Sequence, residues 1–333
     1  MVNINMKEYR PTEKPLIAIL MAVYDPRMEW LTEQLKSLNA QTYPNLVLHI
    51  CDDCSPNVPF HVIESCVREH ITAFPYTVER NEKNLGSNLT FERLTRECDE
   101  GDFFSYCDQD DIWLPEKLSV LQNAIECENS QLVCSDMLII DADGNHTADS
   151  ITKVRKHHVF RSGTGLAGKL LVTNWVTGCT MLVRRDAAKA AIPYCPYMVH
   201  DHFIALCCAA RGKIISLPDK LIEYRIHENN QTLAMKGVVD KDSYLELRIV
   251  QMQKRARWLY DNLDCSDELR GELAKCIEWA DARYRNWTVH RGGAAMLKYK
   301  RFSPLVSAYE LVVGFLPAPL FKFTIELNRK NIL

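Results

Sequence analysis

The 333-residue sequence lacks the features that mark several large classes of protein. No apolar run reaches the ~18 to 20 residues of a membrane-spanning helix. There is no G-x-x-x-x-G-K-[ST] phosphate loop and no G-x-G-x-x-G after an apolar strand, which argues against P-loop kinases, ATPases and nicotinamide-dependent dehydrogenases. Lys+Arg number 40 against 43 Asp+Glu, a net charge of −3, so the composition indicates no nucleic-acid partner.

Cysteine is abundant, but its pattern argues against a disulfide framework. The 13 cysteines are an odd number and are scattered, and several lie within apolar runs, as buried free cysteines do. Cys51 and Cys54 form a lone C-x-x-C without the second pair that a zinc site needs. The cysteines therefore predict a reducing, cytoplasmic compartment. The apolar run 16–24 resembles a signal peptide, but it continues into Asp25-Pro26 instead of a small-residue cleavage site.

Short apolar runs alternate with helical patterns over the first 150 residues. Residues 16–23 form a continuous apolar run, typical of a parallel strand that is covered on both faces. Apolar residues at helical spacing follow from Met28 to Leu38. The alternation continues with strands expected at 46–51, 76–79, 103–107 and 131–140 and helices at 62–70, 87–98 and 115–125. This order predicts an α/β domain with a mostly parallel sheet.

The second half of the chain is less regular. It predicts a strand after Gly178, a helix over 200–210 and a short strand over 214–217, and helices dominate from about residue 241. A chain of this length has room for about two domains. We therefore expect a first domain over residues 1–235 and a C-terminal helical subdomain over residues 236–333.

Acidic residues stand where the expected strands end. Asp25 follows the first strand, Asp52 and Asp53 the second, and the segment 108–111 (Asp-Gln-Asp-Asp) the fourth. In sheets of this kind the ligand site lies beyond the carboxyl ends of the strands. Crowded carboxylates are costly unless a cation compensates them, and a hard divalent ion such as Mg²⁺ prefers oxygen ligands. From these residues alone, two interpretations of the segment 108–111 are equally good: a site for a divalent cation, or a solvated acidic turn that begins the helix at Pro115.

Four motifs that follow one another along the chain favour the cation site over the solvated turn. They are the strand 16–24 with Asp25, Ile50-Cys51-Asp52-Asp53-Cys54-Ser55, Asn84-Leu85-Gly86 and Tyr106-Cys107-Asp108-Gln109-Asp110-Asp111-Ile112-Trp113. Their order and spacing resemble family 2 glycosyltransferases over roughly residues 15–232, and the last two resemble the rhamnosyltransferase-like branch. The resemblance implies an α/β GT-A fold, a Rossmann-like mixed sheet of nucleotide-diphospho-sugar transferases, with a C-terminal helical extension.

The resemblance implies roles for residues of the donor site. Ala22 and Tyr24 match the strand end that lines the nucleotide-base pocket, and Asp53 matches the carboxylate that accepts a hydrogen bond from the pyrimidine N–H. Asp108 and Asp110 match the D-x-D pair: the first faces the ribose, and the second binds the divalent metal, Mg²⁺ or Mn²⁺, that bridges the diphosphate.

Three later segments resemble the rest of the family pattern. Trp175, Thr177 and Gly178 match the acceptor-side loop, where close approach of the backbone requires glycine. Asp201 matches the catalytic base, although His200 stands where family members often have Glu.

The third of these segments is Tyr224-Arg225-Ile226-His227. Arg225 matches a residue that approaches the diphosphate of the donor, and His227 matches a residue that approaches the diphosphate and the metal, so we expect His227 to be a metal ligand.

The resemblance implies an inverting, metal-dependent hexosyltransferase. The predicted donor is dTDP-L-rhamnose, and the predicted acceptor is a hydroxyl of a glycan or a lipid-linked acceptor in surface polysaccharide synthesis. A UDP-hexose transferase of the same fold is the main alternative. A nucleotidyltransferase and a non-catalytic protein that binds sugar or nucleotide are the rivals from other classes.

The C-terminal part is basic and apolar. From Tyr284 to Leu333 there are 8 Lys+Arg and 2 Asp+Glu, and the stretch 305–323 is apolar. One interpretation is peripheral contact with anionic lipid at the inner face of the plasma membrane. The other is packing on the catalytic domain or on a second copy of the chain in a homo-oligomer, which is favoured because Pro304, Pro317 and Pro319 interrupt a long amphipathic helix.

Overall fold

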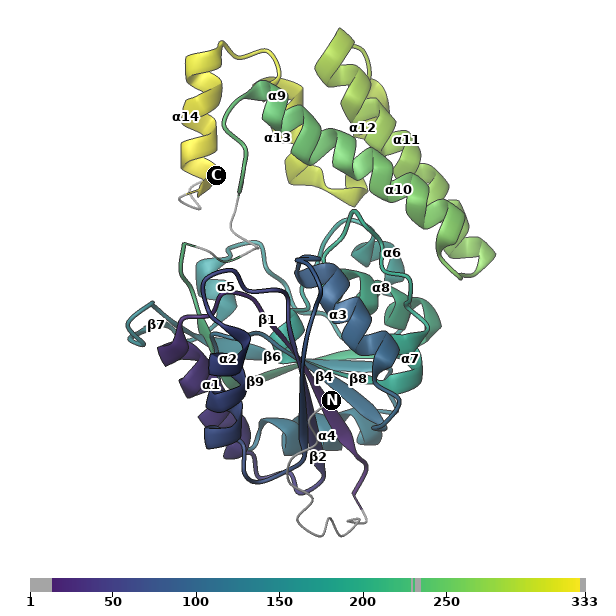
Figure 1. Cartoon of the computed structure of the whole chain (residues 1–333). Helices are drawn as coiled ribbons and strands as arrows, with labels where there is room; N and C mark the ends of the chain where they lie inside the picture. Colours follow the sequence, from purple (N-terminus) through teal and green to yellow (C-terminus); the bar gives the residue numbers. More distant parts are fainter. Residues whose placement is uncertain (1–13, 229, 231–234, 330–333) are drawn as a thin grey trace.

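The computed structural model describes residues 14–228, 230 and 235–329. A mixed sheet of nine strands in the order β3-β2-β1-β4-β8-β6-β9-β5, with β7 paired to β6, forms its centre (Figure 1). The strands are β1 (Ile17–Val23), β2 (Leu46–Asp52), β3 (Tyr76–Arg80), β4 (Phe103–Cys107), β5 (Ile112–Trp113), β6 (Leu132–Ile140), β7 (His146–Ala148), β8 (Met181–Arg184) and β9 (Ile214–Arg225).

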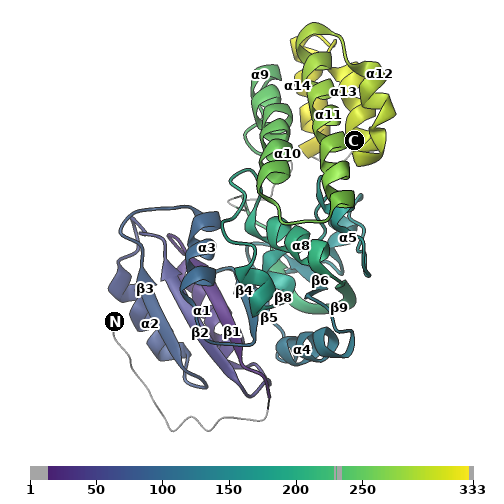
Figure 2. The same ribbon diagram turned by 90° about the vertical axis from the view of Figure 1, so that its right-hand side faces the viewer.

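Helices cover both faces of this sheet and continue beyond it (Figures 1 and 2). Those of the sheet domain are α1 (Met28–Asn39), α2 (Phe60–His70), α3 (Ser87–Glu97), α4 (Lys117–Cys127), α5 (Ile151–Val154), α6 (Ala167–Leu170), α7 (Arg185–Lys189) and α8 (His200–Arg211). The C-terminal ones are α9 (Lys241–Tyr244), α10 (Gln251–Asn262), α11 (Asp267–Val289), α12 (Gly293–Lys298), α13 (Pro304–Val313) and α14 (Ala318–Arg329).

The first strand shows why the sequence forms a central sheet. Its side chains alternate between two cores: Ala18 and Leu20 pack on one face, and Ile17, Ile19 and Met21 pack on the other. Since both faces are covered, neither set of alternate residues is polar, as the continuous apolar run predicted. β1 pairs in parallel with β2 and β4, so the expected α/β domain is confirmed.

The structure refines two expectations about strands. The sheet is mixed, as the family resemblance implied: the strands β1 to β4 pair in parallel, and β8 pairs antiparallel with both β4 and β6. The strand expected at 214–217 extends to Arg225 as β9, and its later residues pair with β6 up to Ile140. Irregular register around Asp136 accommodates the polar stretch that follows Leu217, and this stretch had hidden the strand in the sequence.

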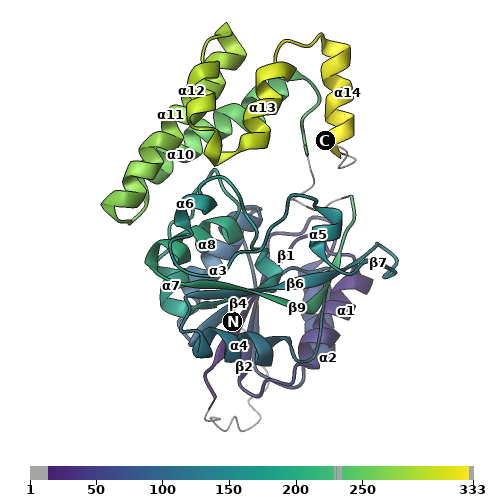
Figure 3. The ribbon, with the colours of Figure 1, turned by 180° about the vertical axis from the view of Figure 1, so that it is seen from behind.

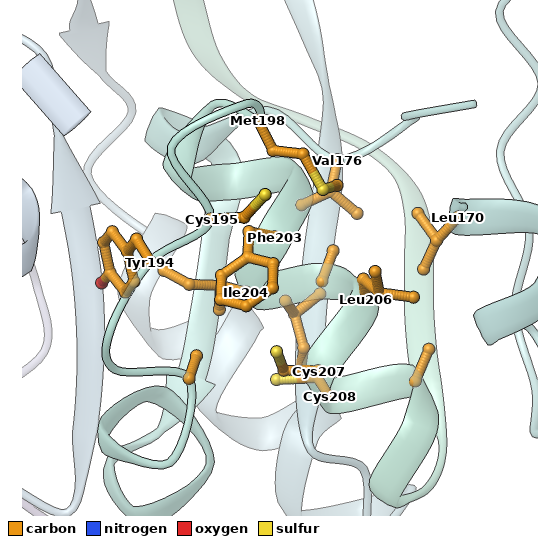
Figure 4. Close-up of a cluster of buried hydrophobic side chains, with 14 of the residues drawn as sticks. Leu170, Val176, Tyr194, Cys195, Met198, Phe203, Ile204, Leu206, Cys207 and Cys208 are labelled. Carbon is orange, nitrogen blue, oxygen red and sulfur yellow. The ribbon is translucent and has the colours of Figure 1, made fainter. Parts of the chain in front are cut away.

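The C-terminal helices are built on two cores. α10 and α11 continue the core around α6 and α8, where Phe203 and Trp258 meet edge to face at 5.5 Å. Figure 4 shows part of this core, with the free cysteines Cys207 and Cys208 of α8 among apolar side chains. A smaller second core, farther from the sheet (Figure 3), contains the following buried residues: Val238, Tyr244, Ile249, Val313, Phe321 and Ile325. Among the described residues, no helix is long and apolar enough to cross a membrane.

Candidate functional site

A cleft of about 980 Å³ opens at the carboxyl ends of β1, β2 and β4. These ends point toward the side on which the C-terminal helices lie (Figure 1). Nine of the residues singled out from the sequence line the cleft: Ala22, Tyr24, Asp53, Asp108, Asp110, Thr177, Gly178, Asp201 and His227. Parallel strands bring their ends to one edge, which is why residues far apart in the chain meet here. Arg225 and Trp175 do not line it.

The end of β1 is fixed by side chains from other segments. The backbone N–H of Tyr24 donates to Gln109 Oε1 (2.7 Å), and Gln109 Nε2 donates to the Tyr24 carbonyl (3.1 Å). Asp25, with φ of 46°, accepts hydrogen bonds from the backbone N–H groups of Asn57 and Val58. Gln109 therefore links the end of β1 to the acidic segment 108–111, and Asp25 holds the loop at residues 57–58.

Asp53 organises the loop before α3. Its Oδ1 accepts from Asn81 Nδ2 (2.6 Å) and from the N–H of Leu85 (2.8 Å), and its Oδ2 accepts from the N–H of Gly86 (2.8 Å). A carboxylate has about four acceptor positions, so these three bonds leave room for one more donor. Gly86, with φ of 82°, allows the turn that aims two N–H groups at this carboxylate. Asn81 was missed in the sequence.

The acidic segment after β4 meets the end of β9. Asp110 Oδ2 and His227 Nε2 lie 2.8 Å apart, and the N–H of Arg225 donates to Asp111 Oδ1 (3.0 Å). Asp108, Asp111 and Cys179 also offer ligand atoms within 4.8 Å of one another. Burial raises the pKa of the Cys179 thiol well above its usual range, so this thiol stays protonated and is a poor ligand.

The donor set suits a hard divalent ion. Carboxylate oxygens with one imidazole are ligands that Mg²⁺ and Mn²⁺ accept, and Asp110 and His227 already face each other at the cleft. Asp108, two residues before Asp110, lies on the same cleft and provides a second carboxylate there. The residues present therefore fit the metal that the motif implied.

Burial and like charges perturb these carboxyl groups. Burial, with Asp110 and Asp201 nearby, raises the pKa of Asp108 to about 7. Burial, together with Asp110 and Asp108, raises the pKa of Asp111 well above its usual range. The buried cation behind them is Lys117, whose Nζ donates to the Cys179 carbonyl (2.6 Å) and whose pKa burial lowers to about 7. Lys117 was missed in the sequence, because it reads as an ordinary surface residue of α4.

Arg225 lies behind the cleft wall, contrary to the sequence expectation. It is 1% exposed, and its Nε donates to the Asp110 carbonyl (2.8 Å) while Nη2 pairs with Glu33 (2.6 Å). Nη1 donates to the carbonyls of Asp141 and Ala142. The guanidinium is thus engaged by protein groups, because β9 turns it toward α1 rather than toward the cleft. It holds the backbone of the acidic segment.

Trp30 of α1 connects this arginine to the cleft. Its ring lies 5.2 Å from the Arg225 guanidinium and 4.8 Å from the His227 ring, and its Nε1 donates to the Ala142 carbonyl (3.2 Å). Arg27 lies over the same ring at 4.5 Å. Both Trp30 and Arg27 line the cleft, and the sequence gave no motif that singles them out.

Asp201 stands in the first turn of α8. Its Oδ2 accepts from the N–H of Gly178 (3.0 Å) and its Oδ1 from Asn174 Nδ2 (3.1 Å). Burial raises the pKa of Asp201 to about 6, against these hydrogen bonds, which lower it. A carboxylate with such a pKa is ionised at neutral pH and still takes up a proton readily. Asn174 was missed in the sequence.

His200 packs between Gly178 and the aromatic side chains of the floor. Its ring is 4.2 Å from the Phe91 ring and 5.5 Å from the Tyr106 ring, and burial lowers its pKa to about 3. A Cβ at position 178 would stand 2.7 Å from His200 Nε2, so only glycine fits there. The imidazole is therefore neutral and adds no charge beside Asp201.

Trp175 belongs to the core rather than to the cleft. It is 2% exposed and packs with the residues around α8. Thr177 and Gly178, which follow it, are on the cleft, and the Thr177 carbonyl accepts hydrogen bonds from the N–H and the hydroxyl of Thr180. Trp175 thus anchors the loop that carries them.

Comparison with known proteins gives a consistent result. Residues 18–191 match the family model described as glycosyl transferase family 2. The chain is 26% identical over 248 residues to a dTDP-rhamnosyl transferase, RfbG, of Shigella flexneri, a match that covers 69% of this chain and 79% of that protein.

Solved structures resemble the fold over nearly the whole chain. S. aureus TarS 1–349 in complex with UDP-GlcNAc matches with a TM-score of 0.56 and 16% identity, covering 95% of this chain and 89% of that one. The mannosyltransferase PcManGT from Pyrobaculum calidifontis, in complex with GDP-Man and Mn²⁺, matches with a TM-score of 0.55 and 13% identity, covering 96% and 87%. The expected GT-A fold with C-terminal helices is confirmed.

Proposed function

The chain belongs to glycosyl transferase family 2, and from that premise we propose that it is an inverting enzyme that transfers a sugar from a nucleotide diphosphate to a hydroxyl group. One observation carries this proposal. Asp201, with a pKa of about 6, lies on the same cleft as the Asp110–His227 pair. This arrangement supports the assignment of Asp201 as the base for the acceptor and of the Asp110–His227 pair to the leaving diphosphate.

The nucleotide lies against the ends of β1 and β2 in this proposal. Ala22 and Tyr24 contact the base, and Asp53 uses its remaining acceptor position for the pyrimidine N–H. Asp108 faces the ribose. The exposure of Tyr24, at 45%, leaves its ring available to a base. Gln109 supports this arrangement, since it holds the Tyr24 backbone and belongs to the acidic segment.

Asp110 and His227 hold the divalent metal, Mg²⁺ or Mn²⁺, in this proposal. When bound, the metal supplies positive charge that stabilises the departing diphosphate. Arg225 acts through the protein: it fixes the Asp110 backbone and, through Trp30, the wall that carries His227. Arg27, whose guanidinium lies 4.5 Å from the Trp30 ring, is a cation on the cleft that a phosphate can reach.

Asp201 removes the proton from the acceptor hydroxyl as the oxygen attacks the anomeric carbon. The attack comes from the face opposite the diphosphate, which leaves with the electron pair of the broken C–O bond, so the anomeric configuration inverts. The proton then resides on the Asp201 carboxyl group and passes to water. The N–H of Gly178 and Asn174 Nδ2 keep this carboxylate oriented, and Thr177 and Gly178 border the acceptor.

The donor proposed is dTDP-L-rhamnose, supported by the similarity to the rhamnosyl transferase of Shigella over two thirds of the chain. The apolar floor of Phe91 and neutral His200 suits a 6-deoxy sugar, which presents a methyl group in place of a hydroxymethyl group. A UDP-hexose is the alternative donor, because solved neighbours include a complex with UDP-GlcNAc.

The acceptor proposed is a hydroxyl of a glycan or a lipid-linked acceptor in surface polysaccharide synthesis. The reaction then takes place in the cytoplasm, at the inner face of the plasma membrane. Contact with that membrane or self-association would involve the C-terminal helices. The division of the chain into a catalytic domain, 1–235, and a helical subdomain, 236–333, is part of the same proposal; α9 begins at Lys241.

A donor panel tests the proposal. Purified protein is mixed with dTDP-L-rhamnose, UDP-hexoses or GDP-mannose, with Mg²⁺, with Mn²⁺ or with EDTA, and binding is followed by thermal shift because a ligand of the native state raises its stability. We expect the largest shift with dTDP-L-rhamnose and metal, and slow release of dTDP on incubation. A shift without hydrolysis or transfer would indicate a binding protein, and a preference for nucleoside triphosphates would indicate a nucleotidyltransferase.

A further inference from the structure

Asn81, which directly follows β3, uses its whole side-chain amide in hydrogen bonds within the protein. Its Nδ2 donates to Asp53 Oδ1 (2.6 Å) and to the Thr90 hydroxyl (3.0 Å). Its Oδ1 accepts from Arg93 Nη1 (2.7 Å) and from the Cys51 thiol (3.3 Å). An amide offers two hydrogens and two acceptor positions, so every position of this amide is taken. Asn81 is also buried, at 4% exposure, and it does not line the cleft.

The charges on either side of this amide fix its orientation. The Asp53 carboxylate attracts the hydrogens of Nδ2, and the Arg93 guanidinium attracts Oδ1. A rotation of the amide by 180° would turn Oδ1 toward a carboxylate and the Nδ2 hydrogens toward a cation, so it is disfavoured at both ends. The backbone N–H of Asn81 also donates to the Asp52 carbonyl (2.8 Å), beside Asp53. Asn81 therefore connects the position of Arg93 to one oxygen of Asp53.

Arg93 of α3 acts on the cleft from outside it, since it is not among the residues that line the cleft. Its Nη2 pairs with Glu79 (2.8 Å) and its Nε with Glu97 (2.9 Å), and its side chain is 27% exposed. Ion pairs with this much solvent contribute little to stability. The two carboxylates hold the guanidinium in place, and its specific contact is the hydrogen bond from Nη1 to Asn81.

The orientation of Asp53 decides which base edge the carboxylate can receive. Its Oδ1 accepts from Asn81 and from the N–H of Leu85, and its Oδ2 accepts from the N–H of Gly86 alone. The open acceptor position therefore belongs to Oδ2. An ionised carboxylate only accepts, so this position suits the N–H that uracil and thymine carry at N3 and opposes the bare N3 of cytosine. A mismatch here would leave buried polar atoms unpaired, which is the basis of strong discrimination.

We propose that Asn81 and Arg93 are positioning residues that make the nucleotide site select uracil and thymine over cytosine. Neither residue touches the nucleotide. Arg93 fixes the Asn81 amide and Asn81 fixes Oδ1 of Asp53, which leaves Oδ2 to accept from the base. The inference rests on the proposed function for the place of the nucleotide at Asp53.

Calorimetric titration of the full-length protein with UDP, dTDP and CDP, in Mg²⁺ and without sugar or acceptor, tests this inference. We expect the wild type to bind UDP and dTDP about 100-fold or more tightly than CDP. Asn81→Leu removes one donor from Asp53 and frees its carboxylate to rotate. It is expected to weaken UDP and dTDP binding about tenfold and CDP binding little, so the ratio of the dissociation constants for CDP and UDP falls about tenfold.

Variants of Arg93 test the same contacts without placing a new apolar side chain at a buried site. Arg93→Met removes the donor to Asn81 Oδ1 and is expected to lower the ratio of the dissociation constants about threefold. Arg93→Lys keeps a cationic donor and is expected to restore most of that loss. In sugar transfer, the donor KM rather than kcat is expected to carry the change.

Glu97→Gln is the matched control for Arg93. It removes an ion pair of the same guanidinium without touching Asn81, and it is expected to leave the ratio of the dissociation constants unchanged. The midpoint of thermal unfolding is measured for each variant, because a variant whose fold is merely loosened would weaken the binding of UDP, dTDP and CDP by the same factor.

The outcomes that overturn the inference are distinct from a failure of the proposed function. An unchanged ratio in Asn81→Leu or in Arg93→Met would overturn the inference, as would an equal loss of affinity for all three nucleotides. A wild type that binds UDP and CDP equally would also overturn it and would leave the proposed sugar transfer intact. Selective binding of UDP and dTDP without any sugar transfer would concern only the proposed function.

Discussion

Two groups of charged side chains in this molecule differ in how their charges are arranged and balanced. Asp108 and Asp201 line the cleft, Asp111 lies next to Asp108 behind it, and burial raises the pKa of each. In the C-terminal helices, Arg283 pairs with Glu310 at 4% and 1% side-chain exposure. The first group gathers like charges, and the second joins opposite ones.

The hydrogen bonds around each group show the same contrast. Both oxygens of Glu310 accept from Arg283, and one also accepts from the Tyr244 hydroxyl, so the pair is satisfied within the protein. The cleft carboxyl groups have Lys117 behind them, but its own pKa is lowered to about 7 by burial. Charge at the cleft is thus left to be balanced by a proton or a bound cation, whereas charge in the helices is balanced by the fold.

The largest expected effect is the loss of sugar transfer when the proposed general base, Asp201, is replaced. Asp201→Asn keeps the size of the side chain, but its single amide oxygen can accept from Gly178 or from Asn174 and not from both, and it cannot take up a proton. We expect the transfer rate to fall by about 10² to 10⁴-fold, with donor binding retained. Steady-state kinetics and calorimetric titration of the donor measure the two quantities. Transfer at the wild-type rate would remove Asp201 from the role of base.

The ion pair of the helices is expected to matter for stability instead. Arg283→Met leaves the Glu310 carboxylate buried without a cation, and we expect a loss of about 3 to 5 kcal/mol in the free energy of unfolding, measured with urea. The double substitution Arg283→Met with Glu310→Leu is expected to recover most of that loss. The turnover number of the folded protein is expected to stay unchanged. A single variant as stable as the wild type would contradict this difference between the regions.

Removal of the divalent metal is the next test of the comparison. EDTA is expected to weaken donor binding by the wild type at least about tenfold and to have little further effect on Asp110→Asn, which lacks one ligand charge. Glu116→Gln, at an exposed position before α4, is the control and is expected to respond to EDTA like the wild type. Equal donor affinity with and without EDTA in the wild type would argue against a metal at Asp110 and His227.

The smallest expected effect is the dependence on pH. The proposed base Asp201 acts in its ionised form, and burial raises its pKa to about 6, so we expect activity above pH 6 and its loss below that pH. We expect kcat/KM to halve near pH 6 and to fall about tenfold for each further pH unit. A profile that stays level down to pH 5 would show that the base is a different group. The residual activity of Asp201→Asn is expected to lack this acidic limb.

The sequence predicted much of the cleft because its motifs stand at strand ends. Asp53, Asp108, Asp110, Asp201 and His227 all line one cleft, as their positions after apolar runs or in late motifs indicated. Arg225 is the exception, because it does not line the cleft. Its motif suggested contact with the diphosphate, but β9 directs the guanidinium to Glu33 and to backbone carbonyls. The direction of a side chain depends on the neighbouring strand and helix, which a local motif does not contain.

Residues without a motif were missed for a related reason. Lys117, Trp30 and Asn174 lie in stretches that read as ordinary helix or loop, and they matter through partners between 27 and 197 residues away in the chain. Similarly, the second half of β9 was missed because its pairing with β6 compensates for a polar stretch. Such roles exist only when distant segments meet.

The sequence by itself determined the α/β alternation, the strand-end carboxylates and the helical C-terminal part, because apolar periodicity and turn residues are local properties. Tertiary structure alone decided which charges face the cleft and which are locked in pairs, and which apolar side chains of the basic tail stay in water. Burial and distance set the pKa of Asp201 and the pairing of Arg283 with Glu310, and neither quantity exists before the chain has folded.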